Sequence, residues 1–155
     1  MNFRKSCKNS KLRNIYFRLI HNDFFTHVKM KKYKMTNSDK CPRCEEMEST
    51  KHLLWECNYV KRIWTLYNVM MNKLNLQNEI VLKYEDVYRP GLSVDTCLIK
   101  IRVIQELIQI ERPKNWTEEK IIKISNELIN LEKYNATVKR TLPKFLKIWH
   151  RFLTN

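Results

Sequence analysis

The sequence predicts a mainly α-helical fold with at most one short strand region. Apolar residues recur at steps of three and four over most of the chain, as on the buried face of an amphipathic helix. Only one Gly and four Pro occur in 155 residues, too few for the many tight turns of a sandwich or barrel. Hydrophobic residues make up 43%, enough for a core. We expect one continuous helical domain, or two small ones over residues 1–75 and 76–155.

The N-terminal quarter predicts two helices. From Lys11 onward, one apolar face contains Leu12, Ile15, Tyr16, Leu19 and Ile20. Thr26 is placed to cap a second, short helix that continues to about Tyr33. The preceding residues 1–8 are polar and basic, so we expect Cys7 to be a free thiol there, and Cys97 to lie in the core.

Residues 41–57 contain four zinc-type ligands at zinc-type spacing. Cys41 and Cys44 are two residues apart, His52 follows after seven residues and Cys57 after four more. Such a set can hold one tetrahedral Zn²⁺, and four protein ligands leave no position for substrate, which indicates a structural ion. The alternative is that the cysteines are simply small buried residues. The acidic side chains of this loop, Glu45, Glu46 and Glu48, are interpreted as solvated.

A helix is expected to carry the second pair of ligands. Ser49 or Thr50 can cap it, which puts His52 in its first turn. Cys57 lies five positions further on, and positions five apart do not share a helix face, so the helix must bend or Cys57 must reach back. Asn58 is a plausible place for the bend. A long stripe then follows at helical spacing, formed by Leu53, Cys57, Val60, Trp64, Tyr67, Met71 and Leu74.

The second half predicts a short strand and three helices. Ile80, Leu82 and Tyr84 alternate with polar residues as in a strand, and a turn is expected at 89–91. The helices are expected to begin near Ser93 or Asp95, at Thr117 and at Pro143. On the last helix an outward basic trio is expected, formed by Lys144, Lys147 and Arg151.

Several of these segments resemble the reverse transcriptase zinc-binding domain, which lies downstream of the polymerase in LINE-type, non-LTR retrotransposon proteins. The resemblance rests on residues 18–26, the Cys-Pro-x-Cys pair, residues 52–57 and residues 60–64. It extends less specifically to the C-terminal tail, in the runs 132–134, 138–140 and 144–149. It implies a zinc-binding accessory domain that assists target-primed reverse transcription.

The charge distribution predicts a polyanionic partner. The chain has a formal net charge of +14, and its first 40 residues hold eleven basic and two acidic side chains. Phosphate contact is the functional interpretation, while a solvated helix face and a nuclear import signal are the alternatives. Interleaved aromatic residues such as Phe17 and Phe25 can in principle stack on unpaired bases, although most are expected in the core. The candidate nucleic-acid contacts are Lys11, Arg13, Arg18, Lys29, Lys31, Lys32 and Lys34.

Several classes of function lack their motifs. The sequence has no Gly-rich phosphate loop, no Tyr/Phe-x-Asp-Asp polymerase motif and no zinc-deaminase signature. We therefore expect a non-catalytic chain that takes no small-molecule substrate. It is expected to bind RNA, DNA or both, and to act with a reverse transcriptase or endonuclease in cis or in trans. No apolar run approaches membrane-spanning length, and we expect an intracellular protein of the nucleus or cytoplasm. The rival hypothesis is a zinc-stabilised protein-interaction module.

Overall fold

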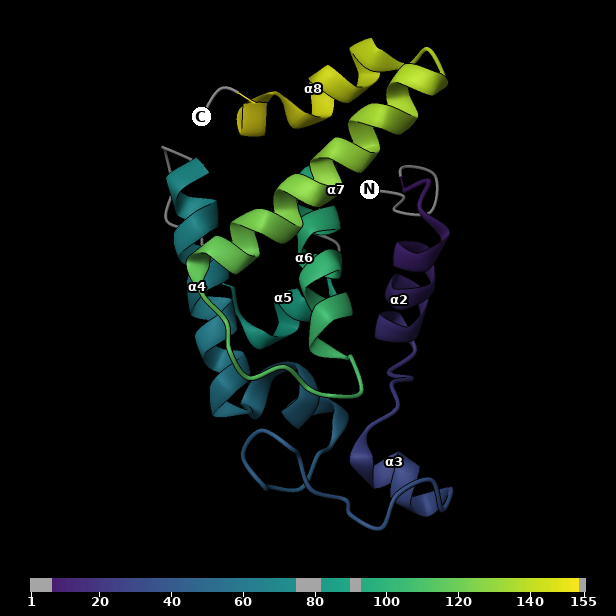
Figure 1. Cartoon of the computed structure of the whole chain (residues 1–155), viewed down its shortest axis with the longest axis vertical. Coiled ribbons are helices and arrows are strands. Elements are labelled where there is room, and N and C mark those ends of the chain that lie inside the picture. The colour runs from purple at the N-terminus through teal and green to yellow at the C-terminus, as the bar shows by residue number, and fades with distance from the viewer. Residues whose placement is uncertain (1–6, 75–81, 90–92, 154–155) are drawn as a thin grey trace.

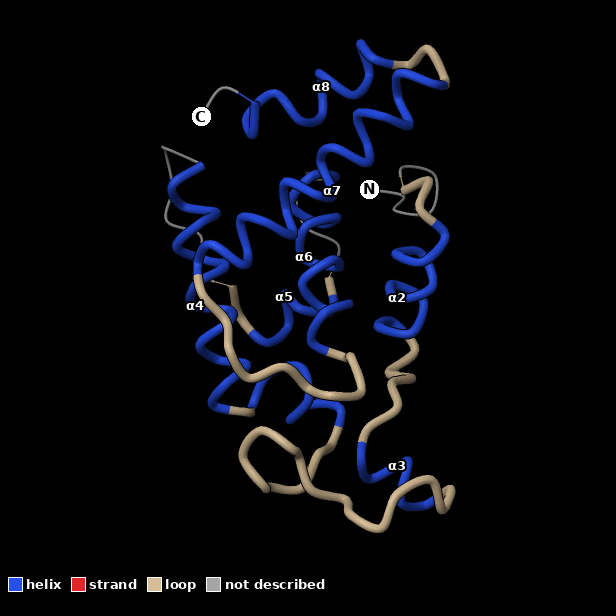
Figure 2. Tube along the Cα trace, viewed as in Figure 1, coloured by secondary structure: helices blue, strands red, loops and turns tan. Residues whose placement is uncertain are grey.

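The structure, a computed structural model, describes residues 7–74, 82–89 and 93–153. Its elements are α2 (Ser10–Ile20), α3 (His27–Lys32), the π-helical turn η1 (His52–Glu56), α4 (Asn58–Leu74), α5 (Tyr84–Tyr88), α6 (Val94–Leu107), α7 (Glu118–Val138) and α8 (Leu142–Leu153). Figures 1 and 2 show helices throughout, and the described residues contain no strand, only one isolated antiparallel bridge between Lys40 and Met47. The predicted mainly α-helical class is confirmed.

Helix α6 is the centre of the fold, with α2, α7, α8 and η1 all packed against it. Figure 1 shows α2 and α4 on opposite sides of it, and α7 crossing between them. Its apolar residues, among them Leu98, Ile101 and Ile104, are almost completely buried. A helix that is covered on several sides in this way buries more than one apolar stripe. Helix α6 is therefore the element that the other helices share.

The first two helices form where the sequence predicts them. The Asn9 side chain accepts hydrogen bonds from the N–H groups of Lys11 and Leu12 and so caps α2. Thr26 caps α3 by accepting from the N–H of Lys29. Leu12, Ile15 and Leu19 form the buried face of α2, as the helical spacing predicts.

One buried ammonium fixes α5 beside α6. Lys100 is 3% exposed, and its Nζ donates to the carbonyl oxygens of Asp86, at 2.6 Å, and of Arg89 at the end of α5. Burial lowers the pKa of Lys100, because removal from water disfavours the charged form. The strand predicted around Tyr84 is wrong at this residue, which begins α5; Ile80 and most of the turn at 89–91 lie outside the described residues. Tertiary contacts with Lys100 decide the conformation here.

Helices α7 and α8 form a hairpin over α6. Thr117 caps α7 as predicted, by accepting from the N–H of Lys120. Phe145 and Trp149 bury the inner face of α8. The prediction that Arg151 points outward is wrong: it donates to Asp95 at 2.6 Å and to Ser93 at 3.1 Å. Asp95 is 1% exposed, so Arg151 compensates a buried carboxylate at the start of α6.

One hydrophobic core contains residues from both predicted parts of the chain, from Cys7 to Trp149. Cys7 is a free thiol as predicted, but its expected place in a polar leader is wrong, since it is 1% exposed and packs in this core. Cys97 is buried as predicted. The predicted boundary near residue 75 falls next to residues 75–81, which are outside the described part. Within the described residues, no helix combines the length and the apolar character needed to cross a bilayer.

The stripe that follows the predicted metal site is part of the core. Trp64, Tyr67 and Met71 are each less than 5% exposed, and α4 packs on η1 and α7. The Trp64 indole N–H donates to the Leu54 carbonyl at 2.7 Å and so holds α4 against the turn that precedes it. This stripe is consequently unavailable as a docking surface for a partner protein.

Candidate functional site

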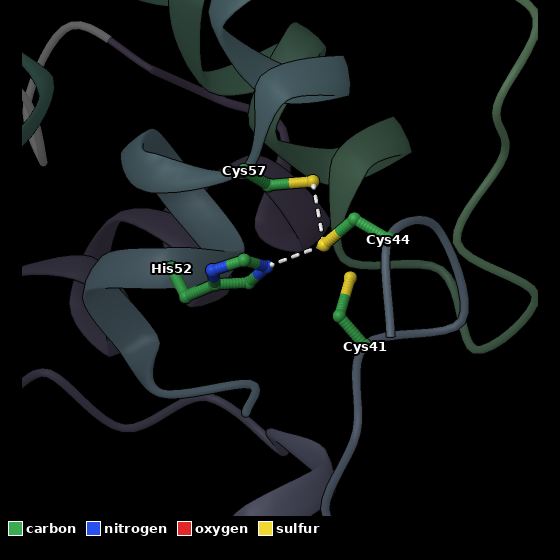
Figure 3. Close-up of side chains that lie close together, drawn as sticks. All are labelled: Cys41, Cys44, His52 and Cys57. Atoms are coloured by element: carbon green, nitrogen blue, oxygen red, sulfur yellow. Dashed lines mark hydrogen bonds between the residues drawn. The ribbon is translucent and has the colours of Figure 1, made fainter. Parts of the chain in front are cut away.

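Four side chains converge between the loop 41–48 and the start of α4. The ligand atoms of Cys41, Cys44, His52 and Cys57 all lie within 4.8 Å of one another (Figure 3). The Cys44 sulfur is 3.7 Å from the Cys57 sulfur and 3.1 Å from His52 Nε2. A tetrahedron with Zn–S bonds of about 2.3 Å has edges of about 3.8 Å. The cluster is thus compact enough for one ion that all four side chains contact.

The π-helical turn η1 solves the spacing problem between His52 and Cys57. The Cys57 N–H donates to the His52 carbonyl at 3.2 Å, an i to i+5 hydrogen bond. Such a bond returns the chain to the same face after five residues, where an α-helix does so after about four. The helical geometry then ends at Cys57, whose ψ is 129°, and α4 begins at the next residue. The expected bend occurs at Cys57 itself, beside the predicted Asn58.

The first pair of ligands sits in a closed knuckle. Cys41 donates its N–H to the Glu46 carbonyl at 2.6 Å, and the Glu45 N–H donates back to the Cys41 carbonyl at 2.8 Å. Glu45 has φ of 65°, a left-handed conformation that turns the chain sharply. The Lys40–Met47 bridge closes the base of the knuckle. Backbone bonds therefore hold the two cysteines together.

The histidine is oriented for metal binding. The backbone N–H of His52 donates to the hydroxyl oxygen of Ser49 at 3.0 Å, so Ser49 caps the start of the helix as predicted. Nε2 faces the sulfur of Cys44, while Nδ1 lies 3.6 Å from a carboxylate oxygen of Glu46. A carboxylate near Nδ1 favours the tautomer with its proton there and leaves the Nε2 lone pair for an ion.

The thiols influence one another's ionisation. A hydrogen bond from Cys57 lowers the pKa of Cys41 well below its usual range, because it favours the thiolate. The same bond raises the pKa of Cys57, which holds the proton. Burial raises the pKa of Cys44. A divalent cation favours the thiolate of every ligand, so proton release accompanies metal binding at such a site.

The donor chemistry fits zinc. Three sulfurs and one imidazole nitrogen are the soft and borderline donors that Zn²⁺ prefers, and no carboxylate belongs to the cluster. Cys41 and Cys57 are at most 1% exposed and His52 is 3% exposed, while Cys44 is half-buried. Elsewhere in the described residues no group of three or more His, Cys, Asp or Glu has this arrangement. His21 and His27, the other histidines of the N-terminal half, are not part of the cluster.

Arg43, between the paired cysteines, ties the knuckle to the second half of the chain. It is 3% exposed. Its Nη2 donates to the carbonyl of Leu107, at the end of α6, at 2.8 Å, and its Nε donates to that of Pro113 at 3.2 Å. Charged hydrogen bonds to helix-end carbonyls also match the negative end of the helix dipole. The knuckle that carries two of the clustered cysteines is thus also attached to the end of α6.

A second buried ion pair lies beside the knuckle. Glu48 is 0% exposed and receives two hydrogen bonds from Arg112, at 2.8 and 3.0 Å. Both the backbone N–H and the ring Nδ1 of His27 also contact Glu48 at 2.9 Å. Burial alone raises the pKa of Glu48, but these bonds outweigh it and the pKa is lowered. The prediction that Glu48 is solvated is wrong, because its partners come from distant segments.

The candidate nucleic-acid contacts are spread over α2 and α3. Lys29 pairs with Asp23 and Lys31 pairs with Asp39, each at 2.9 Å. Arg18 lies over the ring of Phe25, with 5.6 Å between its Cζ and the ring centroid. The remaining predicted contacts are exposed: Lys11, Arg13, Lys32 and Lys34. The structure brings Lys29 to Lys34 together on and after α3, whereas Lys11 and Arg13 lie at the start of α2.

The aromatic residues of this region divide into two groups. Phe24 is 1% exposed and belongs to the core. Phe17, Phe25 and Tyr33 are 44%, 48% and 61% exposed, which is more than the expectation of a core role allows. Phe17 lies about 140° around the axis of α2 from Leu12, away from the buried face, while Phe25 and Tyr33 lie outside the helices, where helical spacing does not apply. Flat apolar side chains therefore accompany the exposed cations.

The comparison with known families agrees with this geometry. Residues 1–64 match the family model described as zinc-binding in reverse transcriptase. The zinc-binding match contains all four clustered ligands together with α2, α3 and η1. It confirms the resemblance seen in the sequence for this part of the chain; the C-terminal runs quoted for the resemblance lie outside the matched residues. No curated protein and no solved structure matches the chain.

The sequence did not point to the side chains that connect this zinc-binding region to the rest of the protein. Glu48 and Arg112 are 64 positions apart, and neither belongs to a recognisable motif. Arg43 occupies the variable position of Cys-Pro-x-Cys, where sequence pattern gives no reason to expect burial. The one available signal was that Arg43 and Arg112 each stand beside a proline turn, which is too weak to identify a contact.

Proposed function

We propose that this chain is a non-catalytic nucleic-acid-binding accessory domain whose fold is stabilised by one structural zinc ion. The observation that carries the proposal is the combination, in residues 11–34 of the zinc-binding match, of exposed cations with exposed aromatic rings. Lysines give sequence-independent affinity for phosphates, and aromatic rings stack on bases of any sequence. Together they suit RNA or an RNA–DNA junction with unpaired bases.

The contacts around α3 support a link between the zinc site and this surface. Glu48 lies between the two pairs of zinc ligands in sequence and binds both the backbone and the ring of His27, the first residue of α3. Arg112 donates to the same carboxylate and to the carbonyl of Phe25. Zinc fixes the loop 41–48, which positions Glu48. Glu48 in turn fixes α3, the helix that carries Lys29, Lys31 and Lys32. In this way a structural ion serves binding without touching the ligand.

The resemblance supplies the biological setting of the proposal. The domain holds nucleic acid for a reverse transcriptase, in cis or in trans, during target-primed reverse transcription of a non-LTR element. It acts inside the cell, in the nucleus or in a cytoplasmic ribonucleoprotein. The side chains at the site fit this supporting role, since four ligands surround the ion and leave no position for a reacting water.

The test is a binding titration of the zinc-loaded chain. A labelled RNA hairpin and a matched DNA duplex are titrated at two salt concentrations. We expect binding that weakens with salt, with a log–log slope of about −0.9 per contacted duplex phosphate, or about −0.7 on single strands. Absence of binding to both ligands at low salt would overturn the proposal.

A pair of matched variants locates the surface. Lys31→Gln, Lys32→Gln and Lys34→Gln together remove three charges around α3. The control removes three exposed charges elsewhere, on α4 and α7, through Lys61→Gln, Arg62→Gln and Lys123→Gln. We expect the first variant to weaken binding and flatten the salt dependence, and the control to do neither. Equal effects of the two variants would assign the affinity to net charge rather than to this surface.

A further inference from the structure

The part of the C-terminal hairpin that follows Glu132 carries charge of one sign only. After Glu132 the chain contains no acidic side chain, whereas five basic residues of this part are exposed. We call these five residues the hairpin surface: Lys133, Lys139, Arg140, Lys144 and Lys147. Tyr134, in the same stretch of α7, is 67% exposed. This surface lies outside the residues that match the zinc-binding family.

These charges are available for a ligand. Within the described ranges, none of the five forms an ion pair with another side chain, in contrast to Lys29 and Lys31 on α3. Arg151, the other basic residue of α8, is already engaged by Asp95. Lys139 interacts with the charge of Glu132, and a cation without such a carboxylate nearby keeps its full attraction for an external phosphate. The hairpin surface is therefore at least as suited to phosphate as α3.

The hairpin surface and the start of α2 lie on the same side of the molecule. Both α2 and α7 pack against α6, and Figure 1 shows the turn between α7 and α8 on the same side as the start of α2. The carboxyl group of Glu132 interacts electrostatically with both Lys8 and Lys139, and also with the buried Cys7 just before α2. Residues 8–22 likewise contain no acidic side chain. Two acid-free segments from opposite ends of the sequence thus share one side of the molecule.

From this juxtaposition we propose that the hairpin surface is a second phosphate-binding surface, continuous through Lys8, Lys11 and Arg13 with the surface on α3. A single nucleic acid would run along this edge of the molecule, from α3 past α2 to the turn between α7 and α8. This inference rests on the proposed function and extends it by assigning the length and path of the ligand.

The length of α2 determines how long a nucleic acid must be to contact both surfaces. Helix α2 has 11 residues and is about 16 Å long. Phosphates along one strand of a duplex are spaced by about 3.4 Å, so α2 alone corresponds to about five base pairs. A ligand that also reaches α3 and the hairpin must be longer. Short ligands are expected to contact one surface, and long ligands both.

The test compares ligands of two lengths with a variant of the hairpin surface. Lys139→Gln, Arg140→Gln and Lys144→Gln remove three charges at the turn, and RNA hairpins with stems of about six and about twenty base pairs are titrated. We expect the variant to lose roughly tenfold to a hundredfold in affinity for the long stem, with a flatter salt dependence. For the short stem we expect a much smaller loss.

The controls separate this inference from the proposed function. The variant of Lys61, Arg62 and Lys123 serves again as the matched loss of three charges, and melting and zinc content verify the fold; if the triple variant fails to fold, Lys139→Gln with Lys144→Gln replaces it. Unchanged affinity for the long stem, alongside a loss in the α3 variant, would overturn the hairpin surface and leave the proposed function intact. Loss of affinity for vesicles with anionic lipid, without any loss for RNA, would likewise overturn it, in favour of a membrane partner.

Discussion

The carbonyl oxygen of His52 accepts a hydrogen bond from the N–H of Cys57, five residues further on, at 3.2 Å. This single bond defines the π-helical turn that places an imidazole and a thiol on one side of the chain. In an α-helix, five residues rotate by about 500°, so Cys57 would lie about 140° around the axis from His52. The local backbone is thus matched to the spacing of the ligands.

Zinc binding is expected to depend on Cys57 and not on the buried cysteines outside the cluster. Cys57→Ser removes one of four ligands, and we expect the zinc content to fall from one ion per chain to near zero. Structural zinc contributes about 10–16 kcal/mol of apparent free energy in small domains, so the loss should unfold the region around the knuckle. Metal analysis and thermal melting measure both effects. Cys97→Ala, at a buried cysteine outside the cluster, is the control and should keep its zinc.

Removing Arg112 should destabilise the fold strongly. Arg112→Ala leaves Glu48 buried, charged and without its main partner, which costs about 3–5 kcal/mol at comparable sites. The free energy of unfolding from denaturant titration measures this. Lys51→Ala, which breaks the exposed pair with Glu56, is the control and should change little. A small effect of Arg112→Ala would show that the pair does not connect α6 to the knuckle in solution.

The same ion pair predicts a dependence of stability on pH. The pKa of Glu48 in the folded chain lies below its ordinary value of 4.5. The pair therefore contributes its full stability above about pH 4.5 and loses it as the pH falls through the folded pKa. The difference in unfolding free energy between the natural chain and Glu48→Gln should shrink on acidification. Because acid releases zinc from both proteins, only this difference is informative, and a constant difference would contradict the assignment.

Arg151 should act on stability and not on nucleic-acid binding. Arg151→Ala leaves Asp95 without its charged partner, and we expect a loss of about 1–3 kcal/mol in the free energy of unfolding. Affinity for RNA should remain that of the natural chain, apart from the small effect of one charge. The comparison is with Lys144→Gln, which should leave stability unchanged and weaken binding. The opposite pattern would return Arg151 to the surface that its sequence position suggests.

Local signals explain why much of the fold was predictable. Leu12, Ile15 and Leu19 repeat at helical spacing, and Thr26 and Thr117 cap the helices that follow them. The clustering of Cys41, Cys44, His52 and Cys57 was predictable because their spacing belongs to a short stretch of chain. In each case the information lies within a few residues of the feature it determines.

Contacts between distant segments explain what was missed. Tyr84 is helical because Lys100 reaches the end of α5, and Glu48 is buried because Arg112 lies beside it. Cys7, just before α2, is buried because α2 packs on α6, a relationship that no local pattern contains. The exposure of Phe25 and Tyr33 also depends on what the rest of the molecule leaves uncovered. Helical periodicity predicts which residues share a helix face, and only tertiary packing decides which faces are buried.

The packing of α2 on α6 has a consequence for how this chain can be divided. The residues that match the family model, 1–64, end before α6, the helix that covers Leu12 and Leu19. Arg43, in the knuckle, likewise donates to the carbonyls of Leu107 and Pro113, which lie beyond residue 64. A polypeptide cut at Trp64 would keep every zinc ligand and yet present a bare apolar side to solvent, and would self-associate. The stretch that matches the family is therefore shorter than the stretch that is needed to bury the core.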